Sequence, residues 1–299
     1  MTVANAPFTV APPRYQLPAR LELGAVKLQV SNIEKSIAFY ERVIGLRVLQ
    51  RDNTSAKLGA HGSNATLVEL TEKAGVRPVP KMGMLGLYHF AILLPTRAAL
   101  GQLLAHLRVL GVHMGMSDHL VSEAIYVNDP DGLGIEVYAD RPRESWKIDG
   151  TAIAMATDPI DVAGLLAAGG DTPWNGAPVG TRMGHVHLYV SNLDQAAEFF
   201  HKGIGFDKVT LQFRGALFMS AGGYHHHLGT NIWAAGSPTA GENDARLLEW
   251  NIHVPLTSDV ADVAHSLQHS GIETTLENDS LVTSDPWGTK VRVSVQARH

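Results

Sequence analysis

Three consecutive histidines, His225 to His227, occur in the segment "SAGGYHHHLGTN". Because the pKa of an imidazole is about 6.5, histidine can bind a metal ion or exchange a proton at neutral pH. A run of three can also be a solvated turn, or a set of core histidines whose nitrogens are hydrogen-bonded. The run by itself leaves these alternatives open, and the elements that position it must decide between them.

The residue types that are missing limit the chemistry. The 299 residues include no cysteine, so any metal ion must be held by His, Asp or Glu. The formal net charge of −5 makes nucleic acid an unexpected partner. No apolar run approaches the roughly 20 residues of a membrane helix, and the first residues lack the layout of a signal peptide. We therefore expect no membrane partner and a cytoplasmic location.

An internal repeat shows how the chain is organised. Residues 24–46, "GAVKLQVSNIEKSIAFYERVIGL", match residues 184–206, "GHVHLYVSNLDQAAEFFHKGIGF", at an offset of 160. Residues 88–112 match the region of residues 249–272 at the same offset, with Pro95 opposite Pro255. Each copy begins as an alternating strand and continues as an amphipathic helix that a Ser or Asn can cap and a Gly can end.

Each half closes with an Asp-Pro turn and a strand, in "VNDPDGLGIEVY" and "TSDPWGTKVRVSV". The chain therefore consists of four βαβββ modules in two similar halves, which predicts an α+β fold with cupped sheets. We assign residues 1–20 to an extended arm, 21–140 to the first repeat, 141–180 to a linker and 181–299 to the second repeat.

The modules resemble the vicinal oxygen chelate superfamily, which contains glyoxalases, bleomycin resistance proteins and extradiol dioxygenases. The stretches "GLYHFAILLP", "DPDGLGIEVYADRPRESW", "GHVHLYV" and "SAGGYHHHLGTNIW" are most similar to its catechol 2,3-dioxygenase-like branch. In that superfamily paired modules surround a divalent metal ion, held by a first-strand His of each module and a last-strand Glu. Two His and one carboxylate form the facial triad of non-haem Fe(II) oxygenases, which leaves open positions on the metal.

The resemblance implies a ligand set that is split between the two halves. The first-strand position is His89 in the second module and His185 in the third, whereas the first module has an alanine there and the fourth has Glu249. The last-strand position is Glu136 in the second module and Arg292 in the fourth. Only the second and third modules supply a complete triad. We therefore predict that these two pair around the metal, and that the first and fourth pair without one.

A site within the first half is the main alternative. Glu69 of "TLVELTEKAG" stands where glyoxalase-like members carry a further ligand. With His89 and Glu136 it would make a carboxylate-rich site for Ni(II), Mn(II) or Zn(II), suited to isomerase or thiol-transfer chemistry. We favour a solvent-facing Glu69. A non-enzymatic binding or resistance protein of the same fold is a third alternative, and it would not need the triad.

The resemblance also gives the histidine run a role. Enzymes of this branch carry there a His that takes a proton from the substrate and later supplies one to the leaving oxygen. Side chains alternate along a strand, so we expect His225 and His227 on one face and His226 on the other. Motif matching assigns the acid–base role to His227, with His226 as the second choice.

Further pocket residues are implied by spacing. Tyr126 lies ten residues before Glu136, as does a Tyr that hydrogen-bonds the catecholate oxygen in enzymes of this branch. His119 is a weaker pocket candidate. Three more aromatic residues are candidates either for the pocket or for the core, namely Tyr224, Trp233 and Trp250.

The sequence thus predicts an Fe(II)-dependent extradiol dioxygenase that acts on catechol or a substituted catechol with O₂. Mn(II) can use the same ligands. The sequence is compatible with a homo-oligomer and does not determine the oligomeric state.

Overall fold

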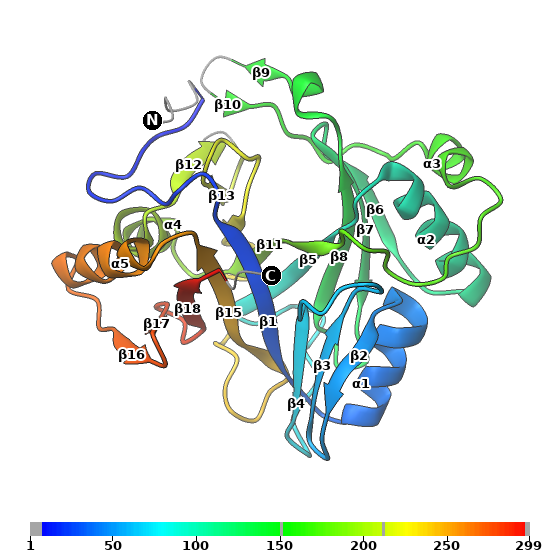
Figure 1. Cartoon of the computed structure of the whole chain (residues 1–299), viewed down its shortest axis with the longest axis horizontal. Coiled ribbons are helices and arrows are strands. Elements are labelled where there is room, and N and C mark those ends of the chain that lie inside the picture. Colours follow the sequence, from blue (N-terminus) through cyan, green and yellow to red (C-terminus); the bar gives the residue numbers. More distant parts are fainter. Residues whose placement is uncertain (1–7, 150–151, 211–212, 297–299) are drawn as a thin grey trace.

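The computed structural model describes residues 8–149, 152–210 and 213–296, and within them all four predicted βαβββ modules form (Figure 1). The first module contains β1 (Glu22–Val30), α1 (Ile33–Phe39), a π-helical turn (Tyr40–Ile44), β2 (Arg47–Arg51), β3 (Ser55–Gly59) and β4 (Val68–Glu72). The second contains β5 (Gly86–Leu93), α2 (Arg97–Leu110), β6 (Gly115–Asp118), β7 (Ser122–Asn128) and β8 (Gly134–Asp140).

The second half repeats this order. The third module contains β11 (Arg182–Tyr189), α4 (Leu193–Ala196), a π-helical segment (Ala197–Ile204), β12 (Asp207–Thr210), β13 (Ala216–Ser220) and β14 (Leu228–Asn231). The fourth contains β15 (Arg246–Val254), α5 (Thr257–His269), β16 (Thr275–Glu277), β17 (Ser280–Ser284) and β18 (Lys290–Val295). Between the halves lie a 3₁₀ turn (Arg143–Ser145), β9 (Ile148–Asp149), β10 (Ala152–Ile153) and α3 (Val162–Gly169).

The helix ends follow the predicted caps. The side chain of Asn32 accepts a hydrogen bond from the Lys35 backbone N–H, and that of Asn192 accepts one from Gln195, both at 2.9 Å. The first-module helix ends at Gly45 in the left-handed region (φ 79°), where a glycine costs the least. The repeat is therefore structural as well as sequential.

The strands pair across the two halves of the chain. β5 pairs antiparallel with β11, and β1 pairs antiparallel with β15. The last strand of each module returns parallel to its first strand, as β8 does to β5 and β14 to β11. A single register pair, Leu23 with Met183, joins β1 to β11 and makes one continuous array of sixteen strands within the described residues.

The helices cover the outside of this array, with α1 and α2 on one side in Figure 1 and α4 and α5 on the other. Their apolar faces form the core against the strands. In α2 the leucines at helical spacing, Leu100, Leu103, Leu104 and Leu107, are all buried. The inner faces of the strands remain free for polar side chains.

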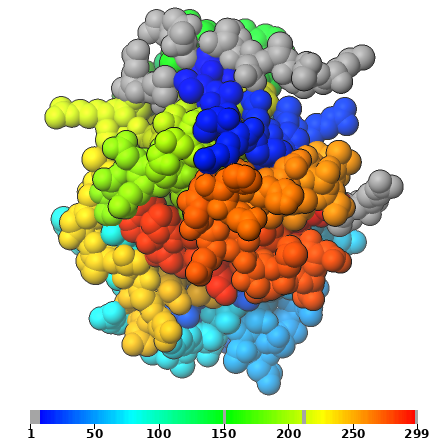
Figure 2. All heavy atoms as spheres, turned by 90° about the vertical axis from the view of Figure 1, so that its left-hand side faces the viewer, coloured from blue at the N-terminus to red at the C-terminus, as the bar shows by residue number. Residues whose placement is uncertain are grey.

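The predicted arm and linker both pack onto the repeats. Figure 2 shows the N-terminal segment (blue) beside α5 (orange), where the Tyr15 hydroxyl lies 3.3 Å from an oxygen of Asp259. Residues 1–7 of the arm lie outside the described part of the chain. In the linker, α3 packs on α2 so closely that a Cβ on Gly101 would lie 2.2 Å from the Leu165 carbonyl oxygen. Among the described residues, every helix is too short or too polar to cross a membrane.

Candidate metal centre and catalytic pocket

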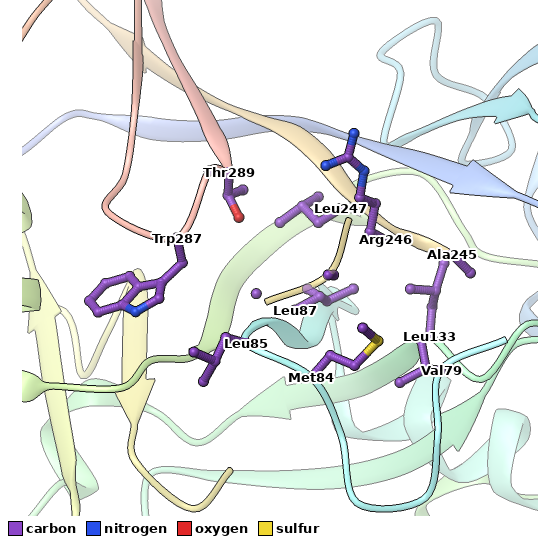
Figure 3. Close-up of a pocket in the computed structure, with 13 residues that line it drawn as sticks. Val79, Met84, Leu85, Leu87, Leu133, Ala245, Arg246, Leu247, Trp287 and Thr289 are labelled. Atoms are coloured by element: carbon purple, nitrogen blue, oxygen red, sulfur yellow. The ribbon is translucent and has the colours of Figure 1, made fainter. Parts of the chain in front are cut away.

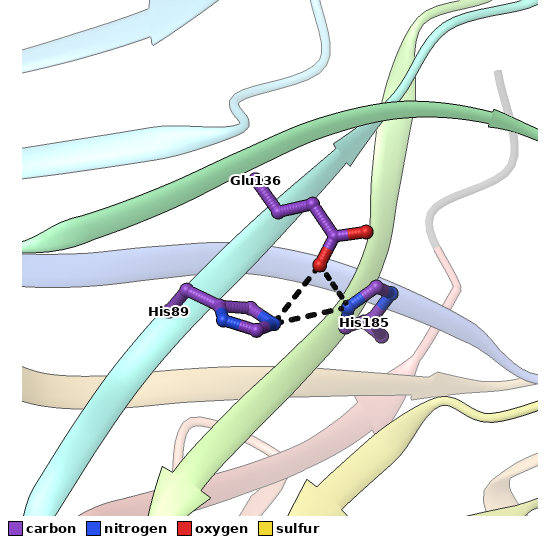
Figure 4. A group of neighbouring side chains, drawn as sticks. All are labelled: His89, Glu136 and His185. Atoms are coloured by element: carbon purple, nitrogen blue, oxygen red, sulfur yellow. Dashed lines mark hydrogen bonds and ion pairs between the residues drawn. The ribbon is translucent and has the colours of Figure 1, made fainter. Parts of the chain in front are cut away.

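Three side chains predicted as ligands converge at one buried point (Figure 4). Glu136 Oε2 lies 3.0 Å from His89 Nε2 and 3.2 Å from His185 Nε2. The two imidazole Nε2 atoms are 3.4 Å apart. In the described part of the chain this is the one group of at least three metal-ligating side chains that converge in this way.

Strand register explains the convergence. Ala91 of β5 lies opposite His185 of β11 on one side and beside Glu136 of β8 on the other. These three residues form a row across the sheet, and His89, two residues before Ala91, projects from the same face. The small side chain of Ala91 leaves the space above the row to the two imidazoles and the carboxylate.

The electrostatics favour an ionised carboxylate at this point. Burial opposes ionisation of Glu136, but His185 and His89 outweigh it and hold the pKa of Glu136 well below its usual value. Burial lowers the pKa of His89, against the opposing effect of Glu136, so that its neutral form is favoured. A neutral imidazole and an ionised carboxylate are the protonation states that a metal ion requires.

The donor atoms also fit a divalent metal ion in their spacing. Ligands of an ion with bonds of roughly 2.1 Å are about 3.0 Å apart at right angles and about 3.4 Å apart at the tetrahedral angle. The observed separations of 3.0, 3.2 and 3.4 Å fall in this range. The Nδ1 atoms of both histidines are buried without a hydrogen-bond partner among the described residues. Both rings contact Glu136 through Nε2, which is therefore the candidate ligand atom.

The centre opens into a cavity of about 410 Å³. One part of its wall is polar and contains His89, His119, Tyr126, Glu136, His187 and His226. The other large lining side chains are aromatic or thioether, namely Tyr88, Met116, Met155, Phe213, Phe218 and Trp233. Met155 belongs to the predicted linker, which therefore contributes to the pocket as well as joining the repeats. A cavity with metal ligands at one end and apolar walls suits a small aromatic ligand.

Tyr126 and His119 form a hydrogen-bonded pair in this wall. Tyr126 stands opposite Glu136 in the β7–β8 ladder, and its hydroxyl is 2.6 Å from His119 Nε2. His119 Nδ1 is 2.7 Å from the Ala156 carbonyl, which can only accept, so Nδ1 carries the hydrogen and Nε2 accepts from Tyr126. Burial, and next Glu136, raise the pKa of Tyr126 well above its usual value. Tyr126 is thus a neutral hydroxyl beside the triad.

The histidine run lies just before β14, and its side chains are divided between two cavities. The ring of His226 stacks on that of His185, with centroids 4.1 Å apart, and it lines the triad cavity. His227 instead lines a second cavity of about 400 Å³, and its Nδ1 accepts a hydrogen bond from the Ala221 backbone N–H. Of the two candidates for the acid–base role, His226 therefore lies in the triad cavity and His227 does not.

Strand alternation accounts for this division. The β11–β14 ladder begins at Val186 and Leu228, and one more pair in the same register would set His227 beside His185. The ladder ends there, although the His227 backbone still bonds to Val186 and to Met219. Gly222 and Gly223, both with positive φ, lie in the turn that precedes the histidine run. His226 and His227 face different cavities, as strand alternation requires, so the motif match differs from the structure by one residue.

The remaining predicted residues are divided among pocket, core and surface. Trp233 lines the cavity, Trp250 is fully buried in the core, and Tyr224 lines the second cavity. Glu69 lies on β4, away from the triad strands, 3.6 Å from Lys57 Nζ. The alternative ligand set with Glu69 is therefore not assembled.

Several residues of the cavity lining were missed from the sequence, and one of them, His187, is a histidine. His187 lies opposite His89 in the β5–β11 ladder, and its Nε2 is 3.0 Å from Asn231 Nδ2. Burial, and then the other imidazoles, lower its pKa well below the usual value. Its spacing of two residues from His185 was the available signal, because alternate residues of a strand share a face.

A further cavity, of about 20 Å³, lies apart from this centre (Figure 3). It is lined mainly by apolar side chains, among them Leu85, Leu87 and Leu247. Its volume is about that of one water probe, so it cannot hold a substrate.

Comparison with known proteins places the chain in a class. Residues 22–137 match the family model of the glyoxalase/bleomycin resistance protein/dioxygenase superfamily. The structure is similar to that of a candidate dioxygenase from Bacillus subtilis (TM-score 0.66, 15% identity, 95% of this chain and 87% of that one). It also resembles glyoxalase I from Zea mays (TM-score 0.54, 17% identity, 92% of each chain). The fold is therefore that of this superfamily.

The sequence gives a closer relationship. The chain is 41% identical to the catechol-2,3-dioxygenase of Bacillus subtilis strain 168 over 267 residues, which cover 88% of this chain and 93% of that protein. The chain belongs to the glyoxalase/bleomycin resistance protein/dioxygenase superfamily, and within it to the family of that protein.

Proposed function

We propose that this protein is an Fe(II)-dependent extradiol dioxygenase that cleaves catechol or a substituted catechol beside its two hydroxyl groups. The observation that carries the proposal is the convergence of His89, Glu136 and His185 at the end of a ring-sized cavity. In this proposal the second and third modules form the metal-binding cup and the first and fourth form a second cup without metal. The division into arm, two repeats and linker, and the cytoplasmic location, are part of the same proposal.

These three side chains would hold the metal and leave one side of it open to the cavity. Bound Fe(II), or Mn(II) in its place, supplies positions for both catechol oxygens and for O₂. The neutral imidazoles and the single carboxylate offset the metal charge only in part, so an anionic catecholate remains favoured there.

The neighbouring side chains would handle the substrate and its protons. We assign the acid–base role to His226, because it lies against His185 in the cavity wall and is buried. Burial, and then the nearby imidazoles, lower its pKa well below the usual value, so the ring is neutral and has a nitrogen that can accept a proton. The Tyr126 hydroxyl can turn from His119 to a catechol oxygen, and the apolar wall would exclude water around the ring.

The decisive experiment is ring cleavage by the iron-loaded protein. The protein is loaded with Fe(II) without oxygen, catechol is added, and O₂ is then admitted. We expect a yellow ring-cleavage product and the uptake of one O₂ per catechol. Full iron loading without O₂ uptake or product from any catechol would contradict the proposal. The Glu136→Gln variant, in which the carboxylate ligand is lost, is the matched control.

A further inference from the structure

A continuous chain of hydrogen bonds runs from the triad cavity to the second cavity. His226 Nδ1 is 2.8 Å from His225 Nδ1, and His225 Nε2 is 2.9 Å from Asp140 Oδ1. The other carboxylate oxygen, Asp140 Oδ2, is 2.9 Å from the Tyr224 hydroxyl, which is 2.7 Å from the Tyr138 hydroxyl. At one end of this series of hydrogen bonds, His226 lines the triad cavity. Toward the other end, Tyr224 lines the second cavity.

Two elements distant in sequence build this chain. β8 places Glu136, Tyr138 and Asp140 on one face, because alternate residues of a strand point the same way. The loop before β14 supplies the histidines and Tyr224. A Cβ on Gly184 would lie 2.0 Å from the Tyr138 hydroxyl, so the glycine before His185 makes room for this contact. The arrangement is therefore built into the site and does not depend on a surface contact.

The direction of each bond follows from the donors available. The carboxylate of Asp140 only accepts, so His225 Nε2–H and the Tyr224 hydroxyl donate to it. A neutral His225 then has a lone pair on Nδ1, which can accept only if His226 carries its hydrogen on Nδ1. The remaining nitrogen of His226, Nε2, has the free lone pair. His225 is completely buried and His226 nearly so, so water does not compete for the bond between the two imidazoles.

We propose that Asp140 and His225 are positioning residues that hold His226 in one tautomer, with its hydrogen on Nδ1 and the free lone pair on Nε2. This inference rests on the proposed function. In the acid–base step of that function, a catechol O–H bond breaks and an N–H bond forms at His226 Nε2, which leaves a catecholate and an imidazolium. No oxidant is consumed, and the reverse transfer returns the proton to the product.

The arrangement resembles that of an Asp that orients a catalytic His, with a second His placed between them and with Asp140 only partly buried. A role limited to packing would not require the two Nδ1 atoms to face each other. It would also tolerate an isosteric amide in place of Asp140. These two differences separate the roles by experiment.

The first test is the Asp140→Asn variant. The side-chain nitrogen of the new Asn can donate a hydrogen bond toward His225, which would reverse the donor and acceptor at each bond between Asp140 and His226. We expect kcat to fall by about 100-fold or more, within the range for a disabled general base, while KM for catechol and iron content stay near those of the parent protein. Asp207→Asn is the control, because Asp207 is also a hydrogen-bonded carboxylate, bound by Gln16, but lies outside the cavity lining. An Asp140→Asn variant with the parent kcat would overturn the proposal.

A second readout does not depend on turnover or on the variant folding. In the unsubstituted protein loaded with Zn(II), ¹⁵N NMR of the histidine rings identifies the protonated nitrogen of each ring. We expect hydrogen on Nε2 of His225 and on Nδ1 of His226. Hydrogen on Nε2 of His226 would overturn the inference even if the protein cleaves catechol. If the iron-loaded protein cleaves no catechol but shows the expected tautomers, the proposed function fails and the hydrogen-bond assignment stands.

Discussion

Arg292 binds Glu249 through two hydrogen bonds, Nε to Oε1 at 2.7 Å and Nη2 to Oε2 at 3.1 Å. The two residues lie on β18 and β15, at the module positions where the second module carries Glu136 and His89. The guanidinium of Arg292 cannot ligate a metal ion. It also hydrogen-bonds both oxygens of Glu249, the carboxylate at the position that corresponds to His89. The cup formed by the first and fourth modules therefore contains an ion pair where the other cup has its ligand triad.

We expect one metal ion per chain, held across the two halves. His185→Ala should remove nearly all iron after gel filtration, because two remaining ligands seldom retain a labile ion. Glu69→Ala and Glu249→Gln should keep the parent iron content, because neither side chain lies at the triad. Iron retained by His185→Ala and lost from Glu69→Ala would contradict both the crossed site and the dioxygenase proposal.

The two neighbouring histidines should differ in their effect on turnover. His226→Ala should bind iron and catechol but lose about 10²–10⁴-fold in kcat, the usual range for a general acid–base. His227→Ala should keep its turnover within a few-fold, because that side chain faces the other cavity. Steady-state kinetics of both variants at matched iron content measures this, and the reverse ranking would show that His227 reaches the substrate.

Removal of the Tyr126 hydroxyl should weaken catechol binding without loss of metal. A hydrogen bond to a charged oxygen contributes about 1.5–3 kcal/mol, so Tyr126→Phe should lose about 10- to 100-fold in kcat/KM. Tyr15→Phe is the control, because the Tyr15 hydroxyl bonds to Asp259 outside the cavity. Unchanged kinetics in Tyr126→Phe would assign that residue to packing alone.

The cavity should prefer catechols without a charged substituent. Among the described residues that line it there is no Lys or Arg, and the lining includes Met116, Phe213 and Trp233. A carboxylate buried there without a partner would cost several kcal/mol. We therefore expect kcat/KM for 4-methylcatechol to exceed that for 3,4-dihydroxybenzoate by at least about tenfold. Met116→Arg should narrow this ratio, and a preference for the carboxylate in the parent protein would contradict the prediction.

The two Asp-Pro turns should make stability depend on pH. Burial raises the pKa of Asp129 and of Asp285 to about 7, against backbone N–H groups that lower it. Between about pH 4 and pH 7 the folded chain then holds protons that the unfolded chain has lost, so these groups lower the unfolding free energy as pH rises.

Buried histidines act in the opposite direction, so the test compares a variant with its parent. Asp129→Asn keeps an oxygen that can accept from Asp131 and Leu133 but cannot ionise. Urea denaturation should show its stability rising relative to the parent, by up to a few kcal/mol, between pH 4 and pH 7. Asp171 is exposed, so the Asp171→Asn control should show no such change in stability with pH. If the stability difference between Asp129→Asn and the parent does not change with pH, the raised pKa of Asp129 is refuted.

Local patterns in the sequence determined the modules. Strand alternation, the caps at Asn32 and Asn192 and the glycine at position 45 depend on residues close in the chain, so they could be recognised by inspection. The triad could also be predicted, because the resemblance to the superfamily marks the ligand positions in each module and only one pair of modules supplies all three.

Only the tertiary structure showed which histidine contacts the triad and which residues hydrogen-bond to that histidine. His226 lies against His185 whereas His227 faces the other cavity, and the motif match was one residue away from this arrangement, because a motif identifies a strand and not its register against a neighbour. Asp140 and His225 are 85 residues apart and meet only because β8 and β11 are both neighbours of β5. Contacts of this kind depend on how strands order themselves across a sheet, which is set by the packing of the whole chain and not by any local stretch of it.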